Sequence, residues 1–179
     1  MFDKINSRIP GAQAPMPDEK CDTLNIGYEL LKLGNFSTTY TMFKALIGKE
    51  KSPSFLFNLT LCYMEAKDYG SALNSINEAQ SAIKSLIKLT AGPTADNIEQ
   101  TLLKNERRNN IYSQPMMPEF PELFPELSAE YISCLKIDIM LHLEMWSQIV
   151  EQGSVLESKG CENVISAMQT AKNKLTTNK

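Results

Sequence analysis

Histidine is scarce in this sequence, and common catalytic motifs are absent. The 179 residues include one histidine, His142, and no GxxxxGK(S/T), GxGxxG, GxSxG or HExxH pattern. These patterns mark phosphate loops, dinucleotide sites, nucleophilic serines and zinc peptidases. His142 lies between Leu141 and Leu143 without a nearby cysteine, serine or acidic triad partner, which favours a buried or half-buried structural role. We therefore expect no catalytic residues and a protein that is not an enzyme.

Cysteine is also sparse, and its copies lie far apart. Cys21, Cys62, Cys134 and Cys161 form no CxxC pair. A small secreted scaffold held by disulfides would carry more cysteines at closer spacing, and a zinc site would need close pairs or more histidine. We expect four buried thiols in a reducing cytosol, with no metal and no cofactor.

Long apolar runs and excess charge are missing as well. Charged, polar or proline residues interrupt residues 1–20 and the apolar stretch 137–150, so we expect neither a signal peptide nor membrane insertion, and a cytoplasmic location. The formal net charge is −3. The one basic cluster, residues 104–108, lacks interleaved aromatic residues and fits a solvated helix end, so we expect no nucleic-acid partner.

The sequence does contain helical periodicity. It is 42% apolar and 22% charged, and no segment alternates as a strand would. We predict an irregular arm over residues 1–20 and one all-α domain over residues 21–179. Pro53 and Ser128 are typical of helix starts, and Gly34, Gly48 and Gly92 of helix ends. The predicted helices cover about residues 23–33, 36–47, 53–64, 69–89, 94–110, two segments within 128–159, and 161–176.

Residues 111–127 differ from the rest of the chain. Prolines at 115, 118, 121 and 125 predict an extended, polyproline-like path that is not regular helix. The segment also carries Met117, Phe120, Leu123 and Phe124, which is too apolar for a solvated linker. Two hypotheses stay open. The segment is either docked on the helical surface as an internal ligand that covers these side chains, or free and itself the bait for a partner.

Two parts of the helical sequence repeat each other. Residues 23–47 and 56–80 line up when every residue number is shifted by 33. Leu24 then meets Phe57, Asn25 meets Asn58, and Asn35-Phe36 meets Asp68-Tyr69. Both segments predict a helix, a tight turn and a second helix.

This pattern resembles the tetratricopeptide repeat (TPR), a helix-turn-helix unit of about 34 residues. The matches include Leu59, Tyr63 and Ala72 in the second segment, while Thr39 stands where the family prefers alanine. The resemblance implies a right-handed stack of helical hairpins. Its repeats would cover about residues 21–53 and 54–90, with a degenerate third hairpin over 128–159 that has Trp146 in its turn, and a capping helix over 161–176.

The resemblance also implies a concave face that binds partners. Carried over by position, this face holds Leu24, Tyr28, Leu31, Lys32, Phe57, Leu61, Met64 and Glu65. Most of these side chains are apolar, which favours a groove for a hydrophobic peptide or amphipathic helix over a clamp for acidic tails. The alternative is that they form core under the C-terminal half.

Two functions agree with these features. The first is a non-enzymatic adaptor that binds another protein. The second is a chaperone for hydrophobic clients, similar to the TPR chaperones of type III secretion. An enzyme on a helical scaffold is the third and least favoured hypothesis, and the sequence leaves self-association open.

Overall fold

The computed structural model describes residues 19–89 and 111–177, and all regular secondary structure in these ranges is helical. The all-α prediction is therefore confirmed. Of the predicted arm, only Glu19 and Lys20 are described, and they begin the first helix. The predicted helix over residues 94–110 and its basic cluster lie outside the described residues. Within the two described ranges, no helix is long and apolar enough to cross a membrane.

Eight α-helices and one short 3-10 helix make up the described part of the chain. In chain order they are α1 (Glu19–Lys32), α2 (Phe36–Phe43), α3 (Pro53–Glu65), α4 (Tyr69–Leu89), η1 (Ile111–Ser113), α6 (Phe120–Leu123), α7 (Pro125–His142), α8 (Trp146–Glu157) and α9 (Glu162–Thr177). Pro53 lies in the first turn of α3, where its missing N–H has no helical partner to lose.

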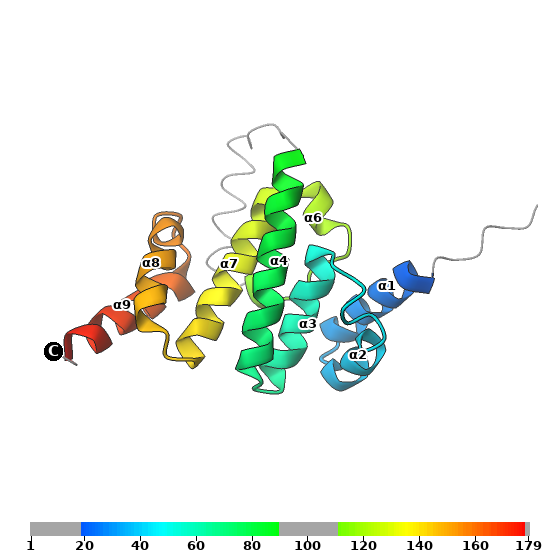
Figure 1. Cartoon of the computed structure of the whole chain (residues 1–179), viewed down its shortest axis with the longest axis horizontal. Coiled ribbons are helices and arrows are strands. Elements are labelled where there is room, and N and C mark those ends of the chain that lie inside the picture. The colour runs from blue at the N-terminus through cyan, green and yellow to red at the C-terminus, as the bar shows by residue number, and fades with distance from the viewer. Residues whose placement is uncertain (1–18, 90–110, 178–179) are drawn as a thin grey trace, which may run out of the picture.

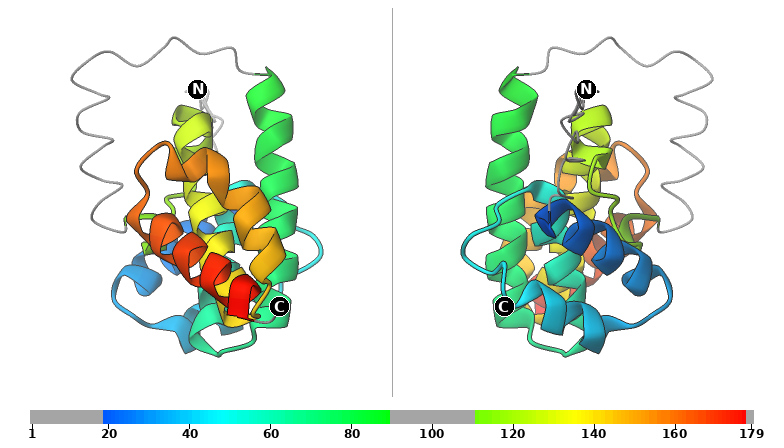
Figure 2. Two further views of the ribbon diagram at one scale, coloured as in Figure 1. Left: turned by 90° about the vertical axis from the view of Figure 1, so that its left-hand side faces the viewer. Right: turned by 90° about the vertical axis from the view of Figure 1, so that its right-hand side faces the viewer.

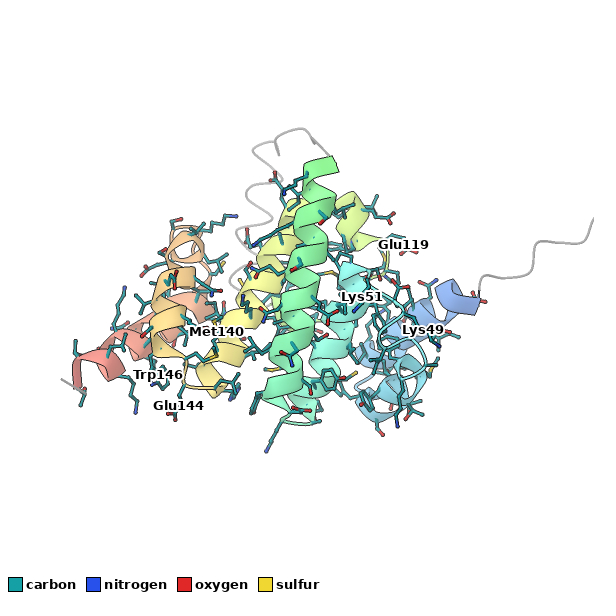
Figure 3. All side chains as sticks on the ribbon, in the orientation of Figure 1. Lys49, Lys51, Glu119, Met140, Glu144 and Trp146 are labelled. Atoms are coloured by element: carbon teal, nitrogen blue, oxygen red, sulfur yellow. The ribbon has the colours of Figure 1, made fainter. Side chains whose placement is uncertain are left out.

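Three of the helix pairs are joined by the same turn. A residue in the left-handed region ends the first helix, and the backbone N–H of the next residue donates to a carbonyl in the last turn of that helix. The left-handed residues are Gly34 (φ 76°), Lys67 (φ 59°) and Glu144 (φ 55°). The closing bonds run from Asn35, Asp68 and Met145 to Leu30, Tyr63 and Met140, at 2.9, 2.9 and 3.0 Å. An aromatic residue then starts the second helix each time, as Trp146 does next to Glu144 in Figure 3.

A glycine sets the distance between α1 and α2. A Cβ atom built on Gly27 would lie 2.3 Å from Cε1 of Phe43, far inside van der Waals contact. Only hydrogen fits there, so the two helices approach closely and Phe43 becomes fully buried. The hydroxyl of Thr39, also fully buried, donates to the carbonyl of Asn35, the residue that precedes α2.

The most enclosed helix is α3. Every side chain from Ser54 to Cys62 is buried, because α2, α4 and α6 all pack against this helix. The long helix α4 also packs on α7, and α8 and α9 pack on α7 and on each other. The helices therefore follow one another in a row in Figure 1, with α8 and α9 at one end and α1 and α2 at the other in Figure 2.

The proline-rich segment departs from its predicted path. Residues 120–123 form helix α6, and α7 begins at Pro125 instead of being capped by Ser128. The prediction of a purely extended segment was wrong, because Pro121 and Pro125 both lie in first turns, where proline costs no hydrogen bond. Ser128 lies inside α7 and is fully buried.

Candidate functional site

Burial divides the predicted partner face into two groups. Leu31, Phe57 and Leu61 are only 3%, 0% and 7% exposed, so they belong to the core. The other members are the half-buried Leu24, Tyr28 and Met64 and the exposed Lys32 and Glu65. A partner would reach only this second group. The core interpretation therefore holds for the first group, and partner binding by the second stays a prediction.

The exposed side chains near the end of α1 contact one another. Lys32 Nζ lies 3.1 Å from a carboxylate oxygen of Glu29 and 5.1 Å from the centre of the Tyr28 ring. Exposed pairs of this kind contribute little to stability, and they leave the helix surface polar. The exposed residues at this end of the predicted face are therefore charged, whereas its half-buried members, Leu24 and Tyr28, are apolar or aromatic.

The face of α3 that carries Leu61 and Glu65 also carries Asn58, and the chain's own proline-rich segment covers that part of it. Asn58 Nδ2 donates to the Met116 carbonyl at 2.8 Å, and the Met116 N–H donates to Asn58 Oδ1 at 2.8 Å. One turn earlier, Ser54 Oγ donates to the Pro118 carbonyl at 3.1 Å. The amide of Asn58 thus binds both backbone groups of one residue, which is how an added strand would bind them.

Burial makes this contact energetically important. Asn58 and Met116 are only 2% and 3% exposed. A buried amide that loses its partners costs about 1–3 kcal/mol for each group left unsatisfied. The segment therefore completes the surface of α3, and any other occupant would have to supply the same two backbone groups.

The other side of the segment is fixed to α7. The Tyr112 hydroxyl donates to Asp138 Oδ2 at 2.7 Å, and Asn163 Nδ2 of α9 donates to Asp138 Oδ1 at 2.9 Å. Burial raises the pKa of Asp138 above its usual range, although both hydrogen bonds favour the ionised form. Burial and the neighbouring Asp138 also raise the pKa of Tyr112, which keeps the phenol protonated and able to donate.

The apolar side chains of the segment are not all covered. Phe120 is half-buried and stacks on Tyr131, with ring centroids 5.9 Å apart. Leu123 and Phe124, however, are 61% and 51% exposed, and Met117 is 37% exposed. The expectation that something covers Leu123 and Phe124 is wrong for the described part of the chain. The docked hypothesis describes Met116 and Phe120. The exposed residues lie beside them, with Met117 before α6, Leu123 at its last position and Phe124 between α6 and α7.

Sequence reasoning missed the residues that hold the segment, namely Ser54, Asn58, Met116 and Asp138. One signal was available, because Asn58 is a lone amide inside the apolar run from Phe55 to Leu61. The expected burial of His142 was wrong. This residue is exposed at the last turn of α7, where its ring stacks on Tyr69 with centroids 4.4 Å apart.

Two kinds of reactive group bear on the chemistry of the described residues, namely metal-binding clusters and thiols. In residues 19–89 and 111–177, no cluster of three His, Cys, Asp or Glu side chains could hold a metal ion. Burial raises the pKa of Cys62 to about 12, so its thiol stays protonated and is a poor nucleophile at neutral pH. A hydrogen bond with Cys161, together with burial, also raises the pKa of Cys134. No family model, curated protein or solved structure matches the chain.

Proposed function

We propose that the chain is a non-enzymatic module that binds an extended peptide of another protein on the face formed by α3 and α7. The observation that carries the proposal is the pair of hydrogen bonds between the Asn58 amide and the backbone of Met116. An amide that binds one N–H and one C=O recognises backbone and not a particular side chain. A peptide from another protein offers the same two groups.

The buried side chain of Met116 indicates which residue a competing peptide would place there. Met116 is 3% exposed, so a competing peptide needs a large, flexible apolar residue at this position. The residue two positions later needs a free carbonyl for Ser54, as Pro118 provides here. The chain's own segment therefore competes with a partner for one face.

The recurring turn supports a TPR-like arrangement of this face. Gly34, Lys67 and Glu144 occupy the same left-handed position in three hairpins, and each hairpin follows it with an aromatic residue. Three such units, with α9 as a cap, are a minimal stack in which neighbours cover each other's apolar faces. The first helices of these hairpins, α1, α3 and α7, would then supply the partner surface of a cytoplasmic adaptor.

The runner-up is a chaperone for hydrophobic clients. The observation in its favour is the exposure of Leu123, the last residue of α6, and of Phe124, which follows it. Such side chains would extend the contact with an apolar client segment. A chaperone would protect a client from aggregation in a light-scattering assay, whereas an adaptor would bind its peptide without that effect.

A selection from a library of random linear peptides tests the main proposal. The full chain with Met116→Gly, which loosens its own segment, serves as bait. We expect peptides with a large apolar residue to be enriched, and the free peptide 111–124 to displace them. The matched bait carries Asn58→Ala in addition and should lose these peptides.

Circular dichroism establishes that both baits keep their helical content. Equal enrichment on the two baits would show that Asn58 is not the recognition element. Peptides that the 111–124 peptide does not displace would place the binding face elsewhere.

A further inference from the structure

A second concave region uses a different side of α7. A cleft of about 490 Å³ lies between α4, α7 and α8, and its lining includes Gln80, Lys84, Lys136 and Leu156. Lys136 and Asp138 are two positions apart, about 200° around a helix of 3.6 residues per turn. The cleft therefore does not overlap the surface that holds the proline-rich segment. Its size lies within the range of about 300–1,000 Å³ that is usual for small-ligand sites.

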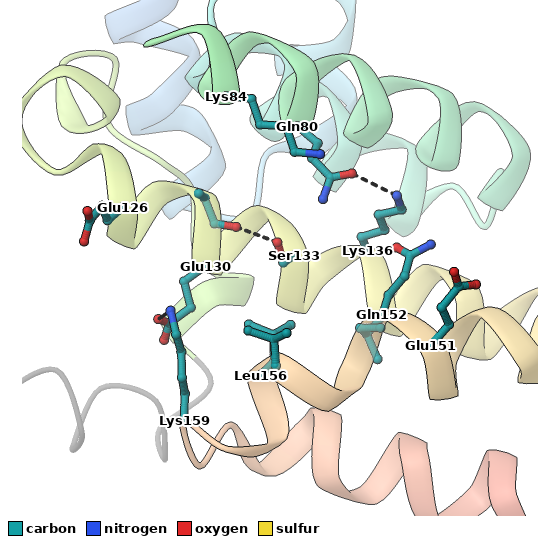
Figure 4. Close-up of a pocket in the computed structure, with 13 residues that line it drawn as sticks. Gln80, Lys84, Glu126, Glu130, Ser133, Lys136, Glu151, Gln152, Leu156 and Lys159 are labelled. Atoms are coloured by element: carbon teal, nitrogen blue, oxygen red, sulfur yellow. Dashed lines mark hydrogen bonds and ion pairs between the residues drawn. The ribbon is translucent and has the colours of Figure 1, made fainter. Parts of the chain in front are cut away.

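One wall of this cleft carries positive charge that no ion pair within residues 19–89 and 111–177 neutralises. Lys136 is only 8% exposed, and its Nζ donates to Gln80 Oε1 at 2.9 Å. Among the described residues, it forms no ion pair. Lys84 reaches into the same wall from α4, next to Gln80, as Figure 4 shows. Burial lowers the pKa of Lys136 because it disfavours the charged form, and the nearby Lys84 lowers it further because it disfavours a second positive charge.

The remaining charges of the cleft do not neutralise this wall. The Glu130 carboxylate is buried and binds Lys159 Nζ at 3.1 Å. Glu126 and Glu151 are exposed, and no dashed line joins them to Lys136 in Figure 4. A buried ammonium group ordinarily has an ionic partner, so the place beside Lys136 favours an anion.

We propose that this cleft binds a carboxylate group between Lys84 and Lys136, with the apolar body of the ligand on Ile137 and Leu156. A singly charged group suits the wall better than a phosphate dianion, because Glu126 and Glu151 also line the cleft and repel a second negative charge. The carboxylate belongs either to a free small acid or to an acidic side chain of a peptide. Both sources present one carboxylate, with a single negative charge, next to an apolar group.

The test uses the full chain with isotope-labelled lysine ε-carbons, observed by NMR. Phenylacetate represents a free acid, and acetylated Leu-Glu-Leu amide represents an acidic peptide. Phenylacetamide and the Leu-Gln-Leu peptide are their neutral counterparts. We expect at least one carboxylate probe to shift the Lys136 signal and to bind about ten-fold more tightly than its amide, because a charge-assisted hydrogen bond is lost in the amide.

Charge-neutralising variants locate the effect. Lys136→Gln and Lys84→Gln should each weaken binding about ten-fold. Lys174→Gln, on α9 and outside the cleft, makes the same change in net charge and should leave binding unchanged. Lys84 is exposed, so its variant is informative even if Lys136→Gln disturbs packing.

The outcomes separate the sources and the alternatives. Binding of phenylacetate alone assigns the cleft to small acids, and binding of the glutamate peptide alone assigns it to a partner's side chain. Equal affinity for acid and amide would overturn the proposal. It would also be overturned by an equal loss in Lys174→Gln and Lys84→Gln, or by a Lys136 signal that neither carboxylate moves.

Discussion

The first and second hairpins have the same turn and the same sequence register, but different surroundings. Gly34 and Lys67 hold the same backbone conformation, and the helices on either side align residue by residue. In α1, Leu31 is buried while Ile26 is 50% exposed. In α3, by contrast, every side chain from Ser54 to Cys62 is buried.

This difference separates what a repeat encodes locally from what its position decides. The turn and the helix ends follow from local residues, since hydrogen bonds within each hairpin satisfy them. Burial follows from the number of neighbours, and α3 has α2, α4 and α6 around it. Two residues at equivalent positions can therefore be core in one hairpin and surface in the other.

Truncating the side chains of one aligned pair to alanine should give the largest difference in stability between the two hairpins. Phe57 is fully buried, and its counterpart Leu24 is half-buried. We expect Phe57→Ala to lower the free energy of unfolding by about 3–5 kcal/mol, from lost burial and the cavity it leaves. Leu24→Ala should lower it by about 1 kcal/mol. Urea denaturation measures both, and equal losses would mean that the two hairpins are equally enclosed.

Alanine substitution at the aligned pair Asn58 and Asn25 should give the second-largest difference. Asn58→Ala removes both bonds to Met116 and should cost about 1–3 kcal/mol. It should also make residues 115–124 sensitive to limited proteolysis. Asn25 is exposed on α1, and Asn25→Ala should leave the protease sensitivity of residues 115–124 unchanged. A segment as resistant in Asn58→Ala as in the parent chain would show that other contacts hold it.

Replacing each of two helical glycines by alanine should change stability in opposite directions. Gly27→Ala places a Cβ against the buried Phe43 ring, and overpacking of this kind costs about 1–3 kcal/mol. A Cβ on Gly70 of α4 meets its nearest atom, Asp68 Oδ1, at 3.7 Å, which is ordinary contact. Gly70→Ala should therefore stabilise the chain by up to about 1 kcal/mol through helix propensity. Thermal melts of both variants check the signs, and a stabilised Gly27→Ala would refute the close approach of α1 and α2.

Exchanging the residues of the turn should have the smallest effect. Lys67 has φ 59° and Gly34 has φ 76°, a region that glycine enters without strain. We expect Lys67→Gly to raise stability by about 0.5–1 kcal/mol and Gly34→Lys to lower it by about 1–2 kcal/mol. Opposite shifts in melting temperature would support a common turn. Shifts of the same sign would mean that the two turns are not equivalent.

Local sequence signals located some helix boundaries and missed others, since α2 ends at Phe43 and not near Gly48 as the sequence predicted. Gly34 and Pro53 mark an end and a start in both the sequence and the structure, because each restricts its own backbone. Ser128 misled, because a proline at the first turn can start a helix earlier, as Pro125 does. Single residues thus predict where a helix ends when the residue restricts its own backbone.

The candidate site was harder to predict, because tertiary packing creates it. The apolar residues on all sides of α3 gave no way to tell Phe57 from a groove residue until its neighbours were placed. The contact of Asn58 with Met116 joins distant parts of the chain, and no periodicity encodes such a pairing. Lys136 is charged and would be expected in solvent, yet α4 and α8 enclose it on α7.

The proline-rich segment lies in the sequence between the two helices that hold it, and this order affects how the chain folds during its synthesis. The support on α3 precedes Met116, whereas the Asp138 support on α7 follows it. A chain growing from its N-terminus completes its early hairpins first, since their contacts are local. Until α7 leaves the ribosome, Tyr112 has no carboxylate to bind, and the segment is held from one side only. The nascent chain therefore passes through an interval in which the α3 face is formed but its final cover is not yet locked.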